Sequence, residues 1–495
     1  MSGPRLTYRF GPLERRGLFG ALRGGQVLII AATVAAALTL LNSSPTPAAA
    51  MLVILVITAG LAVALVPFGR HGADEWLPVL GGYLARALGG RRTFRSARPQ
   101  AGIRGGADTP DAALPPVSLP PVLRGVELTE VAYRGRTIGA VAERGGRRLT
   151  AVLACRVAAF SLLDPEAQER RLARWGLVLS GAAGTPIRRL GWVERTAPAQ
   201  GDELARWLHD ERDPAIPLRG TPIIESYLEL IGASSRITQE HEILVPVQVD
   251  AGRVRERGAD AIGRALVNET ERVAQGLEAA EVAVLGALGT RQLARALRTA
   301  FDPFGRAELA ALEAVEPERC GPPAANAGPL GTQESWEHFR SDGALHCTYW
   351  IAGWPRVDVS PMFMDALLGR SGAVRAVAVT FEPIAPQRST REAEAAITRD
   401  RADRELRRRF GQSETARQRQ AQEATARREA ELAAGHSEVR LAGFITVSGR
   451  DEEELRRACA EVAEHAARAR LELHRMYGQQ ADAFTFTLPL CRGLR

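Results

Sequence analysis

Lysine is absent from this 495-residue sequence, in which all 64 basic residues are arginines. A P-loop of the form G-x-x-x-x-G-K-[ST] needs a lysine to reach the phosphates of a bound nucleotide. Schiff-base chemistry needs a lysine amine as its nucleophile. The composition therefore excludes both kinds of site from this chain.

Cysteine is scarce, and its pattern excludes a disulfide framework. The five cysteines are odd in number, widely separated and never in C-x-x-C spacing: Cys155, Cys320, Cys347, Cys459 and Cys491. Reduced thiols in a cytoplasmic domain account for this pattern.

A metal centre is not indicated either. His338, His346 and Cys347, with Cys320 upstream, are the closest approach to a ligand cluster. Structural zinc sites usually pair their ligands at C-x₂₋₄-C or H-x₃₋₅-H spacing. His346 and Cys347 are adjacent, so on a strand their side chains point to opposite faces. We expect a core cysteine beside a surface histidine, and no metal.

Catalytic motifs are missing in the same way. His241 lies between Glu240 and Glu242, but on a strand both glutamates face away from it. The segment Gly369–Ala373 lacks the final glycine of G-x-S-x-G and is better explained as a link from a helix over 362–368 to the next strand. The sequence therefore predicts no catalytic residue, no cofactor and no enzymatic activity.

Two long apolar runs are the clearest feature that is present. Val27–Leu41 and Ala48–Val66 contain no charged residue and are separated by only six residues. A helix needs about 20 apolar residues to cross a bilayer. The second run meets this length, and the first does so if Gly24–Gln26 lies in the interface. We expect a transmembrane helical hairpin over about 27–41 and 48–66.

Arginines flank the hairpin on both sides, whereas its tip has no charge. Because arginine resists translocation, we expect both flanks, and therefore both termini, in the cytoplasm. The positive charge of residues 1–100 suits anionic lipid headgroups. The residues expected to anchor the chain at the lipid surface are Arg15, Arg16, Arg23, Arg70, Trp76 and Tyr83.

Residues 74–88 have apolar side chains at helical spacing, at Leu77, Leu80, Leu84 and Leu88. A helix lying in the headgroup layer and an ordinary packed helix both fit this pattern. We assign residues 1–92 to the membrane module and the Pro- and Gly-rich residues 93–121 to a linker.

After the linker, strands and helices alternate in two regions, 122–335 and 336–495. Glu240–Val249 is a clear strand, and Pro246 within it suggests a position at the edge of a sheet. The end of the chain predicts strand 439–447, helix 451–470 and strand 471–475, which resembles half of a split ferredoxin-like unit. The fold class is therefore α+β (mixed α/β), with ferredoxin-like β-α-β elements, on a transmembrane hairpin.

Residues 388–434 are almost entirely Arg, Glu, Ala and Gln, which predicts a long helical arm. Acidic residues are interleaved with its arginines, and no aromatic side chains are spaced along it as base-stacking platforms. We therefore expect contact with a protein partner, and direct nucleic-acid binding is disfavoured. The expected contact residues are Arg401, Arg404, Arg407, Arg408, Arg409, Arg417 and Arg428.

Parts of the sequence resemble secretion proteins. Arg9–Arg95, with its basic start, short hairpin and segments Pro67–Arg70 and Asp74–Leu77, is similar to the PrgI-type membrane module of conjugation and type IV secretion systems. The C-terminal Gly443–Val447 and Thr487–Leu490 resemble the end of the non-motor N-terminal domain of conjugation ATPases. The whole chain is similar to a family of actinobacterial-type membrane proteins of largely unknown function that combine these two parts without the motor.

The resemblance implies a non-enzymatic inner-membrane component of a type IV secretion- or conjugation-like machine, which anchors and docks a separate P-loop ATPase. Membrane lipids, other secretion subunits and further copies of the chain are the remaining expected partners. One alternative is a subunit of another secretion apparatus, such as the two-helix membrane subunits of type VII systems. Another is a membrane-bound enzyme with a cytoplasmic α/β domain, and a third is direct handling of DNA through Arg407–Arg409.

Overall fold

The computed structural model describes most of the chain between residues 24 and 494. The described ranges are 24–43, 46–65, 72–96, 119–157, 160–198, 239–306, 327–395 and 437–494, without residues 257, 259, 356 and 370 and with a few isolated positions besides. The chain divides into two compact units. One contains residues 12–92 with Tyr477–Gln479, and the other contains the remaining residues.

The smaller unit begins with two apolar helices, α1 (Gly24–Ser43) and α2 (Pro47–Leu65). Both are long and apolar enough to cross a membrane, with mean hydropathies of 2.0 and 2.4. They pack closely because Gly60 has no side chain: a Cβ atom there would lie 2.2 Å from the Thr33 hydroxyl oxygen. Small residues at such contacts are typical of helix pairs in membranes. The expected hairpin is present, with bounds close to those predicted.

A third helix, α3 (Ala73–Leu88), has the amphipathic character that the sequence predicts. Asp74 and Glu75 occupy its first turn, where negative charge is favourable. Leu77, Leu80, Leu84 and Leu88 are all exposed in the structure. The helix therefore carries an uncovered apolar stripe, which an ordinary packed helix would have buried.

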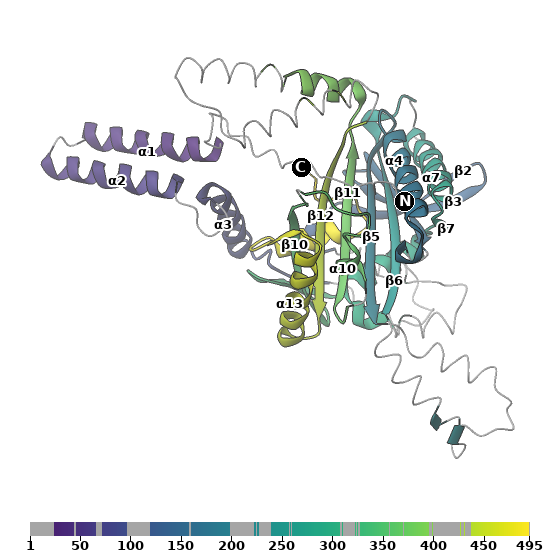
Figure 1. Ribbon diagram of the computed structural model, residues 1–495. Coiled ribbons are helices and arrows are strands. Elements are labelled where there is room, and N and C mark those ends of the chain that lie inside the picture. Colours follow the sequence, from purple (N-terminus) through teal and green to yellow (C-terminus); the bar gives the residue numbers. More distant parts are fainter. Residues whose placement is uncertain are drawn as a thin grey trace, which may run out of the picture. The chain divides into compact units, whose positions relative to one another are not determined.

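The larger unit contains a 13-stranded sheet in which every pair of neighbouring strands is antiparallel. Its order is β1-β8-β9-β10-β12-β11-β5-β6-β4-β3-β2, and β13 and β7 pair with β10 and β4 (Figure 1). The strands are β1 (Thr93–Arg95), β2 (Val126–Tyr133), β3 (Arg136–Glu143), β4 (Arg148–Arg156), β5 (Ile187–Pro198), β6 (Gln239–Asp250), β7 (Ala283–Ala287), β8 (Gly331–Glu334), β9 (Phe339–Ser341), β10 (Ala344–Gly353), β11 (Val374–Pro383), β12 (Val439–Gly449) and β13 (Glu472–Arg475).

The order of elements shows an internal duplication. Residues 126–301 run β2-β3-β4-α4-β5-β6-α7-β7-α8, and residues 331–484 run β8-β9-β10-α10-β11-β12-α13-β13-α14, the same succession of strands and helices. The helices are α4 (Pro165–Gly181), α7 (Ala261–Ala279), α8 (Thr290–Phe301), α10 (Asp365–Leu368), α13 (Glu452–Arg468) and α14 (Gln480–Phe484). The sheet order reads the same from either repeat toward the centre, where β5 pairs with β11. The two repeats are therefore related by an approximate two-fold axis.

Each repeat contains a ferredoxin-like unit. In the second repeat, β12 and β13 flank β10, and α13 connects them, which is a split β-α-β motif. In the first repeat, β6 and β7 flank β4 and α7 connects them. The α+β class and the C-terminal ferredoxin-like element predicted from the sequence are confirmed, and the structure adds a second copy.

Alternating side chains form cores on both faces of the sheet. On one face, α4 and α7 cover the first repeat and α10 and α13 cover the second (Figure 1). On the other face, α8, α14 and the C-terminal residues pack on the sheet, where Phe301, Phe339 and Phe484 meet. Two adjacent residues of β11 show this alternation. Val377 packs in the core beneath α10 and α13, and Ala378 packs in the core on the opposite face of the sheet.

Two sequence predictions are wrong in the described structure. Pro246 does not mark an edge, because β6 lies between β4 and β5. Its ring fits there because the facing residue, Gly191, has no side chain. His346 is not a surface residue, because it is completely buried and its ring nitrogens contact the Ser341 and Ser448 hydroxyls, each at 2.8 Å. His346 and Cys347 do contribute to cores on opposite faces, as predicted.

Other predictions fall partly outside the described residues. The linker 93–121 contributes β1 and the start of a short helix over Pro121–Leu123, and its residues 97–118 are not described. The predicted arm 388–434 is described as helix only over 388–395, with isolated positions beyond. The division at residue 335 stays a prediction, although strands from both sides of it share the one sheet.

Candidate functional site

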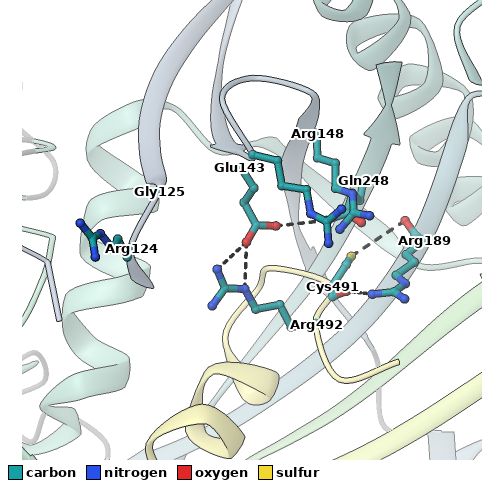
Figure 2. Close-up of a pocket in the computed structure, with 9 residues that line it drawn as sticks. Arg124, Gly125, Glu143, Arg148, Arg189, Gln248, Cys491 and Arg492 are labelled. Atoms are coloured by element: carbon teal, nitrogen blue, oxygen red, sulfur yellow. Dashed lines mark hydrogen bonds and ion pairs between the residues drawn. The ribbon is translucent and has the colours of Figure 1, made fainter. Parts of the chain in front are cut away.

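An arginine-lined cavity of about 260 Å³ lies in the larger unit, between the first repeat and the C-terminal residues (Figure 2). Five arginines and one glutamate line it, together with a glycine, a glutamine and a cysteine. The lining residues are Arg124, Gly125, Glu143, Arg144, Arg148, Arg189, Gln248, Cys491 and Arg492. We refer to this space as the arginine cavity.

The register of the sheet brings these residues together. Glu143 at the end of β3 is opposite Arg148 at the start of β4. Arg148 is opposite Asp250, the last residue of β6. Gln248 of β6 is opposite Arg189 of β5. The charged side chains therefore form a row across one end of four neighbouring strands, although β3 and β5 are far apart in the sequence.

The C-terminal segment closes the cavity from the other side. The Arg492 side chain donates a hydrogen bond of 2.8 Å from Nε to the Glu143 carboxylate (Figure 2). It also donates one of 2.9 Å from Nη1 to the Val122 carbonyl. Glu143 is buried, so loss of Arg492 would leave an unpaired carboxylate in the interior, which is costly. Arg492 and Glu143 tie the end of the chain to the beginning of the first repeat.

Arg189 is buried, and each of its three guanidinium nitrogens donates a hydrogen bond. Its Nε donates to Glu382 at 2.9 Å, Nη1 donates to the Cys491 carbonyl at 3.3 Å, and Nη2 donates to the Leu494 carbonyl at 2.7 Å. Burial opposes the ionisation of Glu382, but the hydrogen bond from Arg189 holds the pKa of Glu382 below its usual value. The role of Arg189 in the wall is therefore structural.

The positive charges of three other arginines in the wall are less well neutralised by acidic side chains. Arg148 contacts Asp250 at 3.2 Å, but Asp250 also contacts Arg188 at 3.1 Å, so one carboxylate serves two guanidinium groups. Burial, and the positive charges of Arg188 and Arg144, lower the pKa of Arg148. Neither Arg124 nor Arg144 forms an ion pair with a described residue. The cavity therefore holds uncompensated positive charge.

Gln248 contributes a buried acceptor. Its amide nitrogen Nε2 lies 3.4 Å from the Glu143 carboxylate, 3.4 Å from the Thr150 hydroxyl and 3.3 Å from the Leu490 carbonyl. These neighbours accept hydrogen bonds, which fixes the nitrogen on their side. The amide oxygen Oε1 is buried and has no hydrogen-bond partner among the described residues. A buried acceptor without a partner is unusual and costly.

The backbone of the wall adopts uncommon conformations. Arg144 and Cys491 have φ angles of 53° and 52°, in the left-handed region that side-chain-bearing residues rarely adopt. Gly125, also in the wall, has a φ of 77°. Such residues are concentrated at functional sites, where the surrounding structure holds them in place.

The arginine cavity contains none of the site residues predicted from the sequence. Arg15, Arg16, Arg23 and Arg70 lie outside the described residues, as do the seven arginines expected to meet a partner: Arg401, Arg404, Arg407, Arg408, Arg409, Arg417 and Arg428. Of the predicted anchors, Trp76 and Tyr83 are described, and both are half-buried in the smaller unit. The Tyr83 ring lies 4.4 Å from the Arg92 guanidinium, and the Trp76 ring lies 6.2 Å from that of Tyr477. Their role at a lipid surface stays a prediction.

Sequence reasoning missed this cavity because its residues extend from position 124 to position 492. One local signal was available: Arg144-Gly145-Gly146-Arg147-Arg148 is a basic, glycine-rich turn between two strands. Among the described residues, no group of three or more His, Cys, Asp or Glu side chains is placed to hold a metal ion.

One family of known proteins is similar to part of the chain. Residues 244–351 match the family described as "Putative type VII ESX secretion system translocon, EccE". The matched segment begins in β6 and ends in β10, so it crosses from the first repeat into the second. No curated protein matches the chain at a significant level.

This match bears on the expectations from the sequence. It supports a secretion-system component, and the two apolar helices support a membrane location. It favours the type VII alternative over the type IV interpretation, and the resemblance to a PrgI-type module fused to an ATPase domain is not supported.

Proposed function

We propose that this protein is a structural membrane subunit of a type VII-like secretion apparatus. In this proposal the hairpin α1–α2 holds the chain in the inner membrane, and the duplicated domain binds neighbouring subunits at the cytoplasmic face. The observation that carries the proposal is the similarity of residues 244–351 to a type VII translocon family. The two helices that meet the length of a bilayer support it independently.

The proposed role is non-enzymatic. Catalytic sites need nucleophiles, acids or bases placed against one another in a cleft. The arginine cavity instead holds guanidinium groups, an amide and a buried thiol whose pKa is raised by burial. These groups can bind an anion, but they do not form a nucleophile–base pair. A P-loop ATPase, which this lysine-free chain cannot supply, would be a separate subunit.

The uncovered stripe of α3 suggests how the chain meets the membrane outside the hairpin. Four exposed leucines follow each other at helical spacing along this helix. Large exposed apolar surfaces mark interaction sites, and an amphipathic helix next to a transmembrane hairpin suits the headgroup layer. We place α3 at the cytoplasmic surface of the bilayer, with Trp76 and Tyr83 on it.

Purification of the tagged full-length protein from native membranes in a mild detergent tests the proposed assembly. We expect other secretion subunits, including a P-loop ATPase, to co-purify. A variant in which charged residues replace four consecutive apolar residues of α2 is the control. It should no longer fractionate with the membrane, and the secretion subunits should no longer co-purify with it. Recovery of the native protein without any secretion subunit would contradict the proposal.

Cysteine labelling tests the orientation separately. Thr46→Cys lies at the tip of the hairpin and Arg134→Cys lies in the exposed turn between β2 and β3. In intact cells a membrane-impermeant maleimide should label the first variant, and it should label the second only after permeabilisation. Labelling of Arg134→Cys in intact cells would place the duplicated domain outside and would overturn the orientation.

A further inference from the structure

We propose that the arginine cavity is a binding site for a phosphate group, either free or at the end of a phosphate monoester. The proposal is independent of the secretion role. It rests on three observations in one place: uncompensated guanidinium groups, a buried acceptor without a partner, and a cavity of suitable size and polarity.

The first observation is the excess of positive charge in the cavity. Five arginines line the cavity with one glutamate, and that glutamate is already bound by Arg492. Among the described residues, Arg124 and Arg144 have no ion pair, and the one carboxylate that Arg148 contacts, Asp250, is shared with Arg188. Arginine presents planar donors that match the oxygens of phosphate. An anion of two negative charges would relieve the mutual repulsion of these side chains.

The buried amide oxygen of Gln248 narrows the choice among possible anions. Gln248, in the cavity wall, has a buried Oε1 with no hydrogen-bond partner in the described part of the chain, and its orientation is fixed by three acceptors around Nε2. A carboxylate or a sulfate has no proton to donate to this oxygen at neutral pH. Inorganic phosphate keeps at least one hydroxyl proton at neutral pH, and a phosphate monoester keeps one in its singly charged form, which is partly populated because its second pKa is about 6. Phosphate therefore satisfies both the guanidinium donors and the amide acceptor.

The space fits such a ligand. About 260 Å³ is far more than one water molecule needs and lies just below the usual range for small-molecule sites. Ligand pockets are usually lined by apolar side chains, whereas this one is lined mostly by charged and polar groups. The lining therefore suits a small, highly charged group rather than an apolar molecule.

Calorimetric titration of the full-length protein in detergent with inorganic phosphate tests the site. Sulfate at matched ionic strength is the comparison ligand. We expect phosphate to bind, and to bind more tightly than sulfate because only phosphate donates to Gln248. The double variant Arg124→Gln/Arg144→Gln should weaken phosphate binding by about tenfold for each arginine removed.

Arg147→Gln is the matched control, because Arg147 belongs to the same exposed turn but does not line the cavity. It should bind phosphate like the native protein. Gln248→Glu should abolish phosphate binding by placing a carboxylate in the wall. Since that buried change could prevent folding, the exposed arginines carry the decisive comparison. Equal binding of phosphate and sulfate, or equal losses in Arg147→Gln and in the double variant, would overturn the proposal.

The source of the phosphate is resolved in lipid nanodiscs. Discs of phosphatidylcholine alone and discs that also contain phosphatidic acid are titrated with the same inorganic phosphate. If the natural ligand is a lipid headgroup, phosphatidic acid should compete in the native protein and not in the double variant. If it is a soluble monoester, both kinds of disc should give the same affinity. Absence of phosphate binding in both would overturn the site itself.

Discussion

Gly191 of β5 faces the ring of Pro246 in the neighbouring strand β6, and a Cβ atom at position 191 would lie 2.6 Å from the proline Cγ. This contact explains how a proline occupies a strand with partners on both sides. Proline removes one hydrogen-bond donor from the ladder, and the missing side chain of Gly191 leaves room for the ring. The Pro246 carbonyl in turn accepts a weak bond from the Cys491 thiol at 3.4 Å.

Gly191→Ala should therefore destabilise the larger unit. The added methyl group overlaps the proline ring, and overpacking of this kind costs about 2 kcal/mol. Thermal unfolding of the full-length protein in detergent measures the change. Gly176→Ala in α4 is the control, because nothing lies within 4 Å of its Cβ position and alanine favours a helix. A native melting temperature in Gly191→Ala would show that the strands separate at this point.

The stability of the larger unit should fall as the pH decreases below 6.5. Burial lowers the pKa of His346 from 6.5 to about 4, so the unfolded chain binds a proton that the folded chain excludes. The stability is present above pH 6.5, is lost progressively through this window and levels off below about pH 4. The loss by pH 5 should be about 2 kcal/mol.

Melting temperatures between pH 5 and pH 7.5 test this dependence. His346→Gln cannot titrate, so its melting temperature should change less across the same range. His338, whose pKa is also lowered by burial, titrates in both proteins and cancels in the comparison. Parallel curves for the two proteins would mean that His346 is not the responsible group.

Cys459 should be the most reactive of the described thiols. A hydrogen bond with Cys347 lowers the pKa of Cys459 to about 7, whereas burial raises the pKa of Cys155 to about 12 and that of Cys491 as well. Because the thiolate is the reactive form, alkylation of Cys459 should rise with a midpoint near pH 7. Mass spectrometry of peptides after brief iodoacetamide treatment reports each cysteine separately. A midpoint near that of an ordinary thiol, about 8.5, would be inconsistent with this environment.

The first turn of α13 depends on one side chain. Asp451 accepts hydrogen bonds from the Glu453 and Glu454 backbone amides, at 2.9 and 2.8 Å. Asp451→Ala should cost about 1 kcal/mol, the usual effect of removing such a cap. Glu453→Ala in the same turn keeps the cap and should cost less. Chemical denaturation separates the two, and equal losses would assign the effect to charge rather than to capping.

Local features of this protein were predictable from its sequence. The apolar runs predicted the hairpin, and the helix predicted over 451–470 is present as α13, with Asp451 as its N-terminal cap. The split β-α-β element at the end of the chain was also predicted, because its strands and helix follow one another directly. Each of these features depends on residues that are close together in the sequence.

Features that depend on distant residues were not predictable. The duplication escaped notice because the two repeats share the succession of their elements rather than a periodic sequence. Pro246 was interpreted as an edge residue because its partner, Gly191, lies 55 positions away across a long connection. His346 was expected at the surface because the hydroxyls that satisfy it come from two other strands. The arginine cavity depends on the register of four strands and on the last residues of the chain.

The two-fold arrangement of the repeats has a mechanical consequence. The long connections 199–238 and 384–438 join corresponding strand pairs, β5–β6 and β11–β12. Since β5 and β11 run in opposite directions, with Leu190 opposite Phe381 and Thr196 opposite Arg375, these connections leave from opposite ends of the strands, about 35 Å apart. A single partner protein that bound both connections would have to extend along the full length of the strands. Two different partner proteins could instead bind at the same time, one at each end of these strands, without competing for the same surface.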